Sequence, residues 1–270
     1  MDLTALLYIA IGLSLIMMIA WAVQRLTGNS GWVDVIWSSA VGLGGVAAAI
    51  LPSAGADLHR RIAVGVLIVL WSARLAWHIA QRAAKGEDDP RYAEMAREAG
   101  KAWPVQLFIF LQIQAAAAFV LVVAVRLAAV HPGPFPAVGD IVGALLLIVA
   151  VAGEGIADAQ LARFGHAHKG EKKVCDIGLW RYSRHPNYFF EWLGWCAWAV
   201  VAVNSQPLSW LALGAPSLMY ILLVHVSGIP PLEKHMLNSR GDAFRDYIAR
   251  TNAFFPGPRH KSDLSKELQS

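Results

Sequence analysis

Charged residues and cysteines are scarce in this sequence, and each scarcity excludes a class of protein. Charged residues occupy 16% of the 270 positions, whereas a soluble domain carries roughly a quarter. Because the mean hydropathy is also high, at +0.46, we expect an integral membrane protein. The two cysteines, Cys175 and Cys196, have no metal-binding spacing and are expected to be unpaired thiols.

The sequence also lacks the motifs of several soluble enzyme classes. No GxGxxG pattern follows a candidate strand, which excludes a Rossmann domain for nucleotide binding. Neither GxSxG nor HExxH occurs, so a hydrolase nucleophile elbow and a helical zinc protease site are excluded as well. The net charge of +4 indicates membrane orientation and lipid headgroup contact rather than nucleic-acid binding.

Long apolar runs are what the sequence does contain. A helix that crosses a hydrocarbon core needs about 20 apolar residues, and seven runs approach or exceed this length. The last two are coupled by a tight hairpin at Asn204–Pro207. The predicted fold is therefore an all-α integral membrane bundle of seven transmembrane helices. The predicted spans are Leu3–Leu26, Trp32–Leu51, Arg61–Ala83, Trp103–Val130, Ile141–Leu161, Tyr188–Val203 and Leu208–Gly228.

The lysines and arginines predict how this bundle is oriented. Most of the 23 lie in the loops on one side of the predicted bundle, which the positive-inside rule makes the cytoplasmic side. The N-terminus is then outside and the C-terminus inside. The first span lacks a basic leading region and a small-residue cleavage site, so we interpret it as an anchor and not as a signal peptide.

Three long polar segments face the cytoplasm in this topology, and we expect them to form one polar cap. They are Gln81–Ala102, Arg163–Asn187 and Pro230–Ser270. Residues 1–258 are predicted to form a single membrane domain, and residues 259–270 a polar C-terminal tail. A polar cap above a membrane cavity suits a water-soluble cofactor that meets a lipid-soluble substrate.

The segment Gly178–Glu191 concentrates polar chemistry at the start of a predicted span. Polar groups at such a place are costly unless they bind something. Pro186 suits the first turn of a helix, where its missing N–H costs nothing. The other N–H groups of that turn add a positive end to a site that already contains Arg184 and His185. This combination predicts a pocket for an anionic cofactor at the membrane surface.

Acids within apolar runs are a second signal, because an intramembrane carboxylate needs a partner or a function. Asp34 lies in the second predicted span, with no basic residue within four positions. Asp158 lies near the end of the fifth span, and Glu191 starts the sixth, one helical turn after Asn187. Arg74 is the only arginine deep inside a predicted span, since the other arginines of these spans lie at or near a span end. It is either a structural partner of an acid such as Asp34 or a member of the site.

Cations near these acids could reach the phosphates of a cofactor. His78, Arg82 and Lys85 lie at helical spacing along one face, and Lys169 lies in the basic loop after Asp158. The alternative is that these side chains only extend to the membrane surface to keep their charges in water.

Short motifs spread along the chain carry a resemblance to a known family. They are Val33–Trp37, Asp88–Tyr92, Gly155–Asp158, His168–Gly170, Gly178–Tyr188, Glu191 and Phe254–Pro256. Together they resemble the steroid 5-alpha-reductase family, and most closely its branch of small bacterial membrane proteins. The Arg184–Tyr188 core is less specific, since similar sequences occur in sterol reductases and in isoprenylcysteine carboxyl methyltransferases. The resemblance implies a bacterial inner membrane location with the cap in the cytoplasm.

The resemblance implies a seven-helix bundle that holds NADPH in a cavity open to the cytoplasm, with no metal. Carried over by motif, the residues that would hold the cofactor are Asp158, Tyr182, Asn187 and Glu191, beside Arg184 and His185. The residues that would face its phosphates are Arg82, Lys85 and Lys169, with His235 and Arg240 as further cofactor-binding candidates.

The activity implied is reduction of a C=C bond conjugated to a ketone, of the 3-oxo-5-alpha-steroid 4-dehydrogenase type. The substrate would be a 3-oxo-delta-4 steroid or a similar lipid enone, with hydride passing to the beta carbon. In the animal enzymes an adjacent Gln-Glu pair and a Tyr contact the ketone of the substrate. In this sequence Val33 and Asp34 occupy the positions of the Gln-Glu pair, and Trp71 lies near the position of the Tyr. Asp34 is therefore predicted to be the catalytic donor, kept protonated by an apolar site, with Arg74 as a second catalytic candidate.

Two other functions stay open from the sequence. An S-adenosylmethionine-dependent methyltransferase of the isoprenylcysteine type shares the Arg184–Tyr188 element, although the cations fit a 2′-phosphorylated dinucleotide better. A small transporter is the non-enzyme alternative, although the sequence shows neither inverted repeats nor broken helices at the midplane. We expect a monomer that contacts membrane lipid and a lipid-soluble substrate, and no nucleic acid.

Overall fold

The chain is helical in the part that the computed structural model describes, which is residues 2–53, 55–86 and 90–260; no strand occurs in these ranges. The α-helices are α1 (Leu3–Thr27), α2 (Gly31–Ile50), α3 (Leu58–Ala83), α4 (Pro90–Ala99), α5 (Trp103–Ala129), α6 (Val138–Ala167), α7 (Pro186–Ala202), α8 (Gly214–Tyr220), α9 (Ile229–Arg240) and α10 (Asp242–Arg250). Short 3₁₀ segments are η1 (Gly100–Ala102), η2 (Gly178–Arg181) and η3 (Pro207–Leu213), and η4 (Ile221–Val226) is π-helical.

The residues divide into two compact units, each with its own internal packing. The N-terminal unit contains Met1–Leu147 and Trp195–Leu218, and the C-terminal unit contains Ile148–Gly194 and Met219–Ser270, each as far as the described residues extend. Helices α6, α7 and α8 contribute residues to both units.

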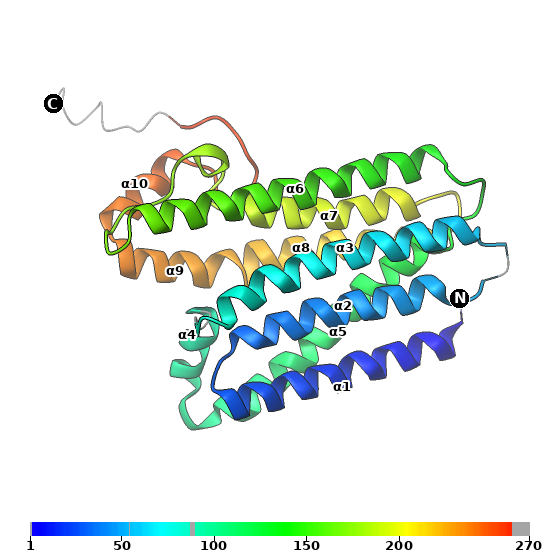
Figure 1. Cartoon of the computed structure of the whole chain (residues 1–270), viewed down its shortest axis with the longest axis horizontal. Coiled ribbons are helices and arrows are strands. Elements are labelled where there is room, and N and C mark those ends of the chain that lie inside the picture. The colour runs from blue at the N-terminus through cyan, green and yellow to red at the C-terminus, as the bar shows by residue number, and fades with distance from the viewer. Residues whose placement is uncertain (1, 54, 87–89, 261–270) are drawn as a thin grey trace. The chain divides into compact units, whose positions relative to one another are not determined.

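Small residues allow the long helices of the N-terminal unit to approach one another (Figure 1). A Cβ at Gly42 of α2 would lie 2.2 Å from the Ser72 hydroxyl of α3. A Cβ at Gly45 would lie 2.7 Å from the Ile68 side chain. The Ser72 hydroxyl also donates to the Ser38 carbonyl at 2.9 Å. Close contact through small residues with a polar bond across it is typical of membrane helix packing.

A buried ion pair joins the start of α3 to the start of α6. Arg60 is fully buried and donates from Nε and Nη2 to the two Asp140 oxygens, at 2.9 and 2.7 Å. Its Nη1 group donates to the His131 and Gly133 carbonyls at 2.7 and 3.2 Å, and Nη2 donates to the Pro134 carbonyl at 2.7 Å. All five guanidinium hydrogens therefore have acceptors.

Helix ends in the N-terminal unit are also satisfied by side chains. The Asp57 carboxylate accepts from the Arg60 N–H at 3.1 Å and so caps the start of α3. Arg126 of α5, which is 3% exposed, donates to the Ala48 and Leu51 carbonyls at 3.0 and 2.7 Å. A cation is favourable at the end of α2, where carbonyls point out of the helix.

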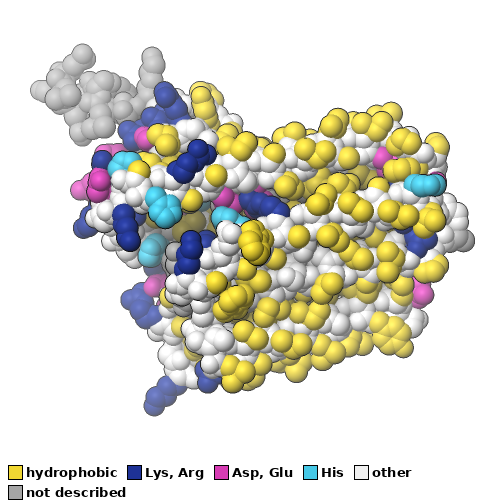
Figure 2. Space-filling view, viewed as in Figure 1, with side chains coloured by type: hydrophobic (Ala, Val, Ile, Leu, Met, Phe, Trp, Pro, Cys, Tyr) yellow, Lys and Arg dark blue, Asp and Glu magenta, His cyan; other side chains and the backbone are white. Residues whose placement is uncertain are grey.

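Within the described residues, six helical stretches are long and apolar enough to cross a membrane. They are Leu3–Thr27, Gly31–Ile50, Leu58–Ala83, Arg91–Ala129, Val138–Ala167 and Pro207–Arg240. Hydrophobic side chains are frequent over α1 in Figure 2, and Leu7, Ile11 and Leu15 of this helix are exposed. The chain is therefore a multi-pass membrane protein, as its composition predicts. Helix α7 has 17 residues and is shorter than these six.

Two predicted spans differ from the helices that form. Helix α6 continues to Ala167, beyond the predicted span end at Leu161, so the polar segment that starts at Arg163 is helical in its first residues. The last turn is held by stacking of Phe164 on His168, with ring centroids 4.3 Å apart, and by a bond from the His168 ring to the Phe164 carbonyl.

The last predicted span is not one regular helix, because η3, α8 and η4 follow one another there. Pro216 lies in the first turn of α8, where proline is tolerated.

Candidate functional site

The motif loop, residues 168–185, joins α6 to α7 and is held on α6 by polar bonds. Gly178 has φ +57°, and a Cβ there would lie 2.5 Å from the Gln160 side chain, so both its backbone and its surroundings require glycine. The Gln160 Oε1 atom accepts from the Leu179 N–H at 2.9 Å. The Trp180 indole donates to a carbonyl of α6 at 2.9 Å. The loop therefore has a fixed course up to the start of α7.

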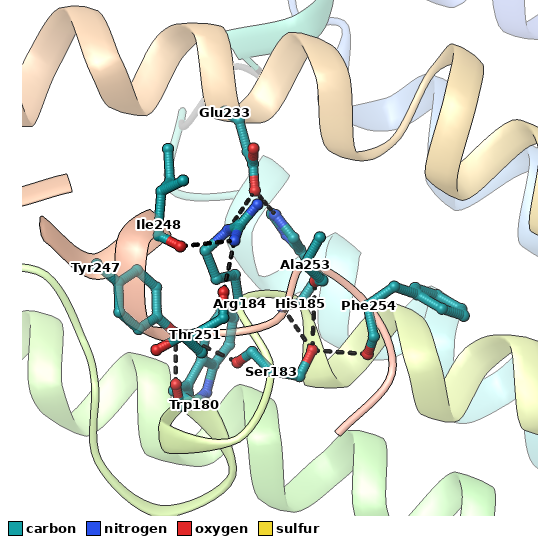
Figure 3. A network of polar contacts seen from close by, with 10 residues as sticks. All are labelled: Trp180, Ser183, Arg184, His185, Glu233, Tyr247, Ile248, Thr251, Ala253 and Phe254. Atoms are coloured by element: carbon teal, nitrogen blue, oxygen red, sulfur yellow. Dashed lines mark hydrogen bonds and ion pairs between the residues drawn. The ribbon is translucent and has the colours of Figure 1, made fainter. Parts of the chain in front are cut away.

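The Glu233 cluster, which comprises Arg184, His185 and Glu233, is the most buried group of charges in the motif loop region (Figure 3). Arg184 Nε donates to Glu233 Oε1 at 2.7 Å, and His185 Nε2 lies 3.0 Å from the same oxygen. The side chains of Arg184, His185 and Glu233 are 10%, 4% and 17% exposed. Arg184 Nη1 also donates to the Thr251 carbonyl at 2.6 Å. Arg184 and His185, which were predicted to bind the cofactor, therefore use these side-chain nitrogens to bind other residues of the protein.

The C-terminal segment after α10 is bonded to the same loop. The Arg184 N–H donates to the Asn252 carbonyl at 2.8 Å, and the Ser183 hydroxyl donates to the Phe254 carbonyl at 2.8 Å. The Tyr247 hydroxyl donates to the Trp180 carbonyl, and Tyr247 is 2% exposed. The two motifs noted in the sequence around residues 178–191 and 254–256 are therefore parts of one polar core.

His185 is held neutral in this core. Burial lowers the pKa of His185 below its ordinary value against the opposing pull of the Glu233 carboxylate, and the Arg184 guanidinium adds to the lowering. Because a carboxylate can only accept, the neutral imidazole donates from Nε2 to Glu233. The ring stacks on Tyr188, with centroids 5.6 Å apart and planes 14° from parallel.

We expect the protein to lose stability as the pH falls from 7 to about 5.5. The unfolded chain binds a proton at His185 near the ordinary histidine pKa of about 6.5, whereas the folded chain binds it only at lower pH. The unfolded state is therefore favoured progressively below about pH 6.5. The measurement is the midpoint of thermal unfolding in detergent at a series of pH values.

Two single variants complete this pH experiment. His185→Gln should reduce the dependence on pH between 7 and 5.5. His59→Gln, at a side chain that is 81% exposed, should keep the dependence of the unaltered protein. If His185→Gln still shows the full decline, the neutral buried imidazole is not its cause.

Asp158 and Asn187, both predicted to hold the cofactor, lie in contact in the C-terminal unit. The Asn187 amide donates to Asp158 Oδ1 at 3.3 Å, which joins α6 to the first turn of α7. Helix α7 begins at Pro186, as predicted from the preference of proline for a first turn. Glu191 lies one turn further along α7 and is buried, with 8% exposure.

Asp34 is held by two residues of α4 in the N-terminal unit. Arg91 Nη2 donates to Asp34 Oδ2 at 2.6 Å, and the Tyr92 hydroxyl donates to Oδ1 at 2.8 Å. The Asp34 side chain is 20% exposed, and Tyr92 is 3% exposed. Both carboxylate oxygens of Asp34 are therefore acceptors in these contacts, which argues against the expectation that Asp34 donates to a ketone. Asp88 and Asp89 of the same motif lie outside the described residues.

The remaining predicted residues are distributed over both units. Arg74 is partly buried on α3, which packs along α2; Arg82 and Lys85 are exposed at the end of α3 and just beyond it. In the C-terminal unit Lys169, Tyr182 and His235 are exposed, and Arg240 donates to the Glu171 carbonyl. The structure thus brings together Asp158 with Asn187, and Arg184 with His185. A single cavity shared by all the predicted residues stays a prediction.

Three residues that complete these contacts were not among the predicted site residues. Arg91 and Tyr92 belong to a motif that the sequence shows, but nothing in the sequence pairs them with Asp34, which lies in a different helix. Glu233 carried one signal: it is the only acid between Glu191 and Asp242. An isolated acid that directly follows an apolar run of a membrane protein indicates a buried partner.

Comparison with known proteins gives a family match for most of the chain. The model of a family described as "Protein of unknown function (DUF1295)" matches residues 20–251. This range contains every predicted site residue and reaches from α1 to the end of α10. No curated protein and no solved structure matches the chain.

Proposed function

The chain belongs to the DUF1295 family, and we propose that it is a membrane reductase that uses NADPH to reduce a C=C bond conjugated to a ketone. The motif resemblance to the steroid 5-alpha-reductase family supports this activity, with a 3-oxo-delta-4 steroid or a similar lipid enone as substrate. Its multi-pass membrane character gives such a substrate direct access from the lipid phase.

The topology that we propose has seven spans, with α7 as the seventh membrane-crossing helix. The N-terminus is outside and the C-terminus inside, because most lysines and arginines then face the cytoplasm. The motif loop and the segment after α10 belong to the cytoplasmic cap. The proposed location is a bacterial inner membrane.

The contact between Asn187 and Asp158 is the observation that carries this proposal. The resemblance assigns both residues to one cofactor, although they are 29 positions apart. At 3.3 Å they are close enough to bind neighbouring polar groups of one ligand. Glu191 lies one turn below them on α7, where its carboxylate suits the carboxamide of a nicotinamide.

The resemblance assigns exposed cations to the phosphates of such a cofactor. Lys169 and His235 are exposed in the C-terminal unit, and within the described residues neither side chain makes an ion pair. Arg82 and Lys85 are exposed in the N-terminal unit. Arg184 and His185, by contrast, support the motif loop from within through Glu233.

When bound, NADPH would supply a hydride to the beta carbon of the enone, and solvent would supply a proton to the alpha carbon. The side chains of this protein would stabilise the negative charge that develops on the ketone oxygen. Both Asp34 carboxylate oxygens already accept, from Arg91 and Tyr92, so Tyr92 is the donor that we propose. A phenol carries one proton, which can turn from Asp34 to a bound ketone.

We expect NADPH to bind the purified protein at least tenfold more tightly than NADH. A charge-assisted bond to the extra phosphate contributes roughly 1.5–3 kcal/mol, which is tenfold or more in affinity. Asp158→Ala and Asn187→Ala should each weaken NADPH binding by about tenfold, since each removes a polar contact of this size. The measurement is a fluorescence titration of the protein in detergent.

The matched control is Asp246→Ala on α10, since Asp246 is exposed and outside the site. It should leave NADPH affinity unchanged. A calorimetric titration with S-adenosylmethionine separates the proposed reductase from a methyltransferase. Equal affinity for NADPH and NADH would contradict the proposal that the cations bind the extra phosphate of NADPH. Tight binding of S-adenosylmethionine, without binding of NADPH, would contradict the reductase and favour a methyltransferase.

A further inference from the structure

A groove with an apolar floor lies along α6 in the C-terminal unit. Its volume is about 640 Å³. Val149, Ala152, Gly153 and Ile156 of α6 form the floor, and Phe190 of α7 closes one side. Phe190 lies directly on Gly153, since a Cβ at that glycine would be 2.4 Å from its ring. The floor residues recur at intervals of three and four and so form one helix face.

One end of the groove is polar and cationic. Gln160, Arg181 and Tyr182 line it there. Gln160 is occupied by its bond to the motif loop. The Arg181 side chain is exposed and makes no ion pair with any residue that the structure describes. A guanidinium next to a phenol can bind an anion, and the oxygens of a phosphate match the geometry of the guanidinium N–H groups.

Asp176, the acid nearest to Arg181 along the sequence, is engaged by other arginines. Asp176 Oδ2 is shared by Arg250 and Arg259, at 3.0 and 2.9 Å. Two guanidinium groups therefore surround one carboxylate, and the polar end of the groove keeps a net positive charge. Arg259 also lies close to the motif loop, where its Nε atom is 3.5 Å from the Arg181 carbonyl.

The length of the groove matches one leaflet of a membrane. The lining on α6 runs from Val149 to Gln160, which at 1.5 Å per residue is roughly 16 Å. Half of a hydrocarbon core is about 15 Å. Val149 and Ile156 are exposed, at 53% and 51%, on a helix that is long and apolar enough to span a membrane. The medium that reaches this floor in a bilayer is therefore lipid.

We propose that the groove binds one anionic phospholipid of the surrounding leaflet. An acyl chain would lie on the floor between Val149 and Ile156, with Phe190 beside it, and the phosphate would contact Arg181 at the polar end. Asp158 and Asn187, the contact that carries the proposed cofactor site, do not line the groove, and of the residues predicted to hold the cofactor only Tyr182 does. The groove is therefore proposed as a separate site that has Tyr182 at its edge. The inference does not depend on the proposed reductase activity.

Native mass spectrometry tests this proposal with two lipids of the same acyl chains, palmitoyl-oleoyl phosphatidylglycerol and phosphatidylcholine. The delipidated protein, in an equimolar mixture of the two, should bind one phosphatidylglycerol about fivefold or more in preference to phosphatidylcholine. Ala152→Trp fills the floor and should lower retention of both lipids about fivefold or more. Arg181→Gln should keep retention but remove the preference for phosphatidylglycerol. Glycerol 3-phosphate at millimolar concentration should not displace the lipid.

Two exposed positions of α6 outside the groove provide matched controls, Ala159→Trp and Arg163→Gln. Both should behave as the unaltered protein does, and a size-exclusion profile reports whether each variant is folded. Unchanged lipid retention in a folded Ala152→Trp protein would overturn the proposal that lipid binds in this groove. An equal loss of preference in Arg163→Gln and Arg181→Gln would overturn the role of Arg181, because it would indicate only general attraction to cations. Displacement by glycerol 3-phosphate would show a phosphate site rather than a lipid site. If Ala152→Trp does not fold, Ala152→Leu is the substitute, with the same expected direction.

Discussion

Tyr92→Phe is expected to lower turnover of a steroid enone about a hundredfold or more, within the range for losing one donor to a developing oxyanion. The substitution removes only the hydroxyl that donates to Asp34 at 2.8 Å and that we propose turns to the ketone. NADPH affinity should survive, because the proposed cofactor contacts at Asp158 and Asn187 lie on other helices. Single-turnover oxidation of NADPH, monitored at about 340 nm, measures the chemical step.

The Asp34 variants distinguish the roles of the two side chains. Asp34→Asn keeps an acceptor for Tyr92 but removes the charge that holds Arg91, so it should retain more activity than Tyr92→Phe. Tyr8→Phe, at an α1 side chain that is 69% exposed, is the matched control and should have no effect. A folded Tyr92→Phe protein with normal turnover would contradict the proposed role of the phenol as donor. It would not contradict NADPH binding, which the titration of the purified protein tests independently.

Arg60→Met is expected to lower the free energy of unfolding by roughly 3–5 kcal/mol, because removing one partner leaves the other charge buried and unpaired. Asp140 would lose both guanidinium bonds, and the His131, Gly133 and Pro134 carbonyls would lose their donors. Arg60→Lys should also be costly, since an ammonium cannot reproduce the two parallel bonds to a carboxylate. The measurement is denaturant or thermal unfolding in detergent.

The double variant Arg60→Met with Asp140→Leu makes this prediction specific. Replacing both charges by apolar groups should restore much of the lost stability, because no buried charge is then left alone. Arg25→Met, at an exposed arginine of α1, should change stability by no more than about 0.5 kcal/mol. If the single Arg60 variant is as stable as the Arg25 variant, the ion pair does not hold α3 against α6.

The sequence predicts the long helices well, because apolar length is a local property. The first four predicted spans end close to the ends of α1, α2, α3 and α5. The last predicted span differs from the structure because hydropathy does not report local helix type. Pro207 opens η3, Pro216 lies at the start of α8, and Pro230 and Pro231 lie in the first turn of α9. Each proline favours a helix start, so the prolines themselves mark these divisions.

The partners of charged side chains were much harder to predict. Asp34 and Arg91 are 57 positions apart, and Arg184 and Glu233 are 49 apart. Pairs at such separations depend on how helices pack, and a single sequence, without an alignment of related sequences, carries no record of that packing. From the sequence, the chemistry of the motif around Arg184 is expected to serve a cofactor. In the structure two of its side chains turn inward to Glu233.

The bonds between the motif loop and the segment after α10 also set the order in which the protein can be completed on the ribosome. Ser183 and its acceptor Phe254 are 71 residues apart, and at about 5–20 residues per second the second follows the first by roughly 4–14 seconds. During that interval Arg184 has neither the Thr251 carbonyl nor the Asn252 carbonyl to bond. The C-terminal unit therefore acquires its polar core only when the segment after α10 has been synthesised. A nascent chain that stops before Thr251 would display these unmet polar groups to the machinery that removes incomplete membrane proteins.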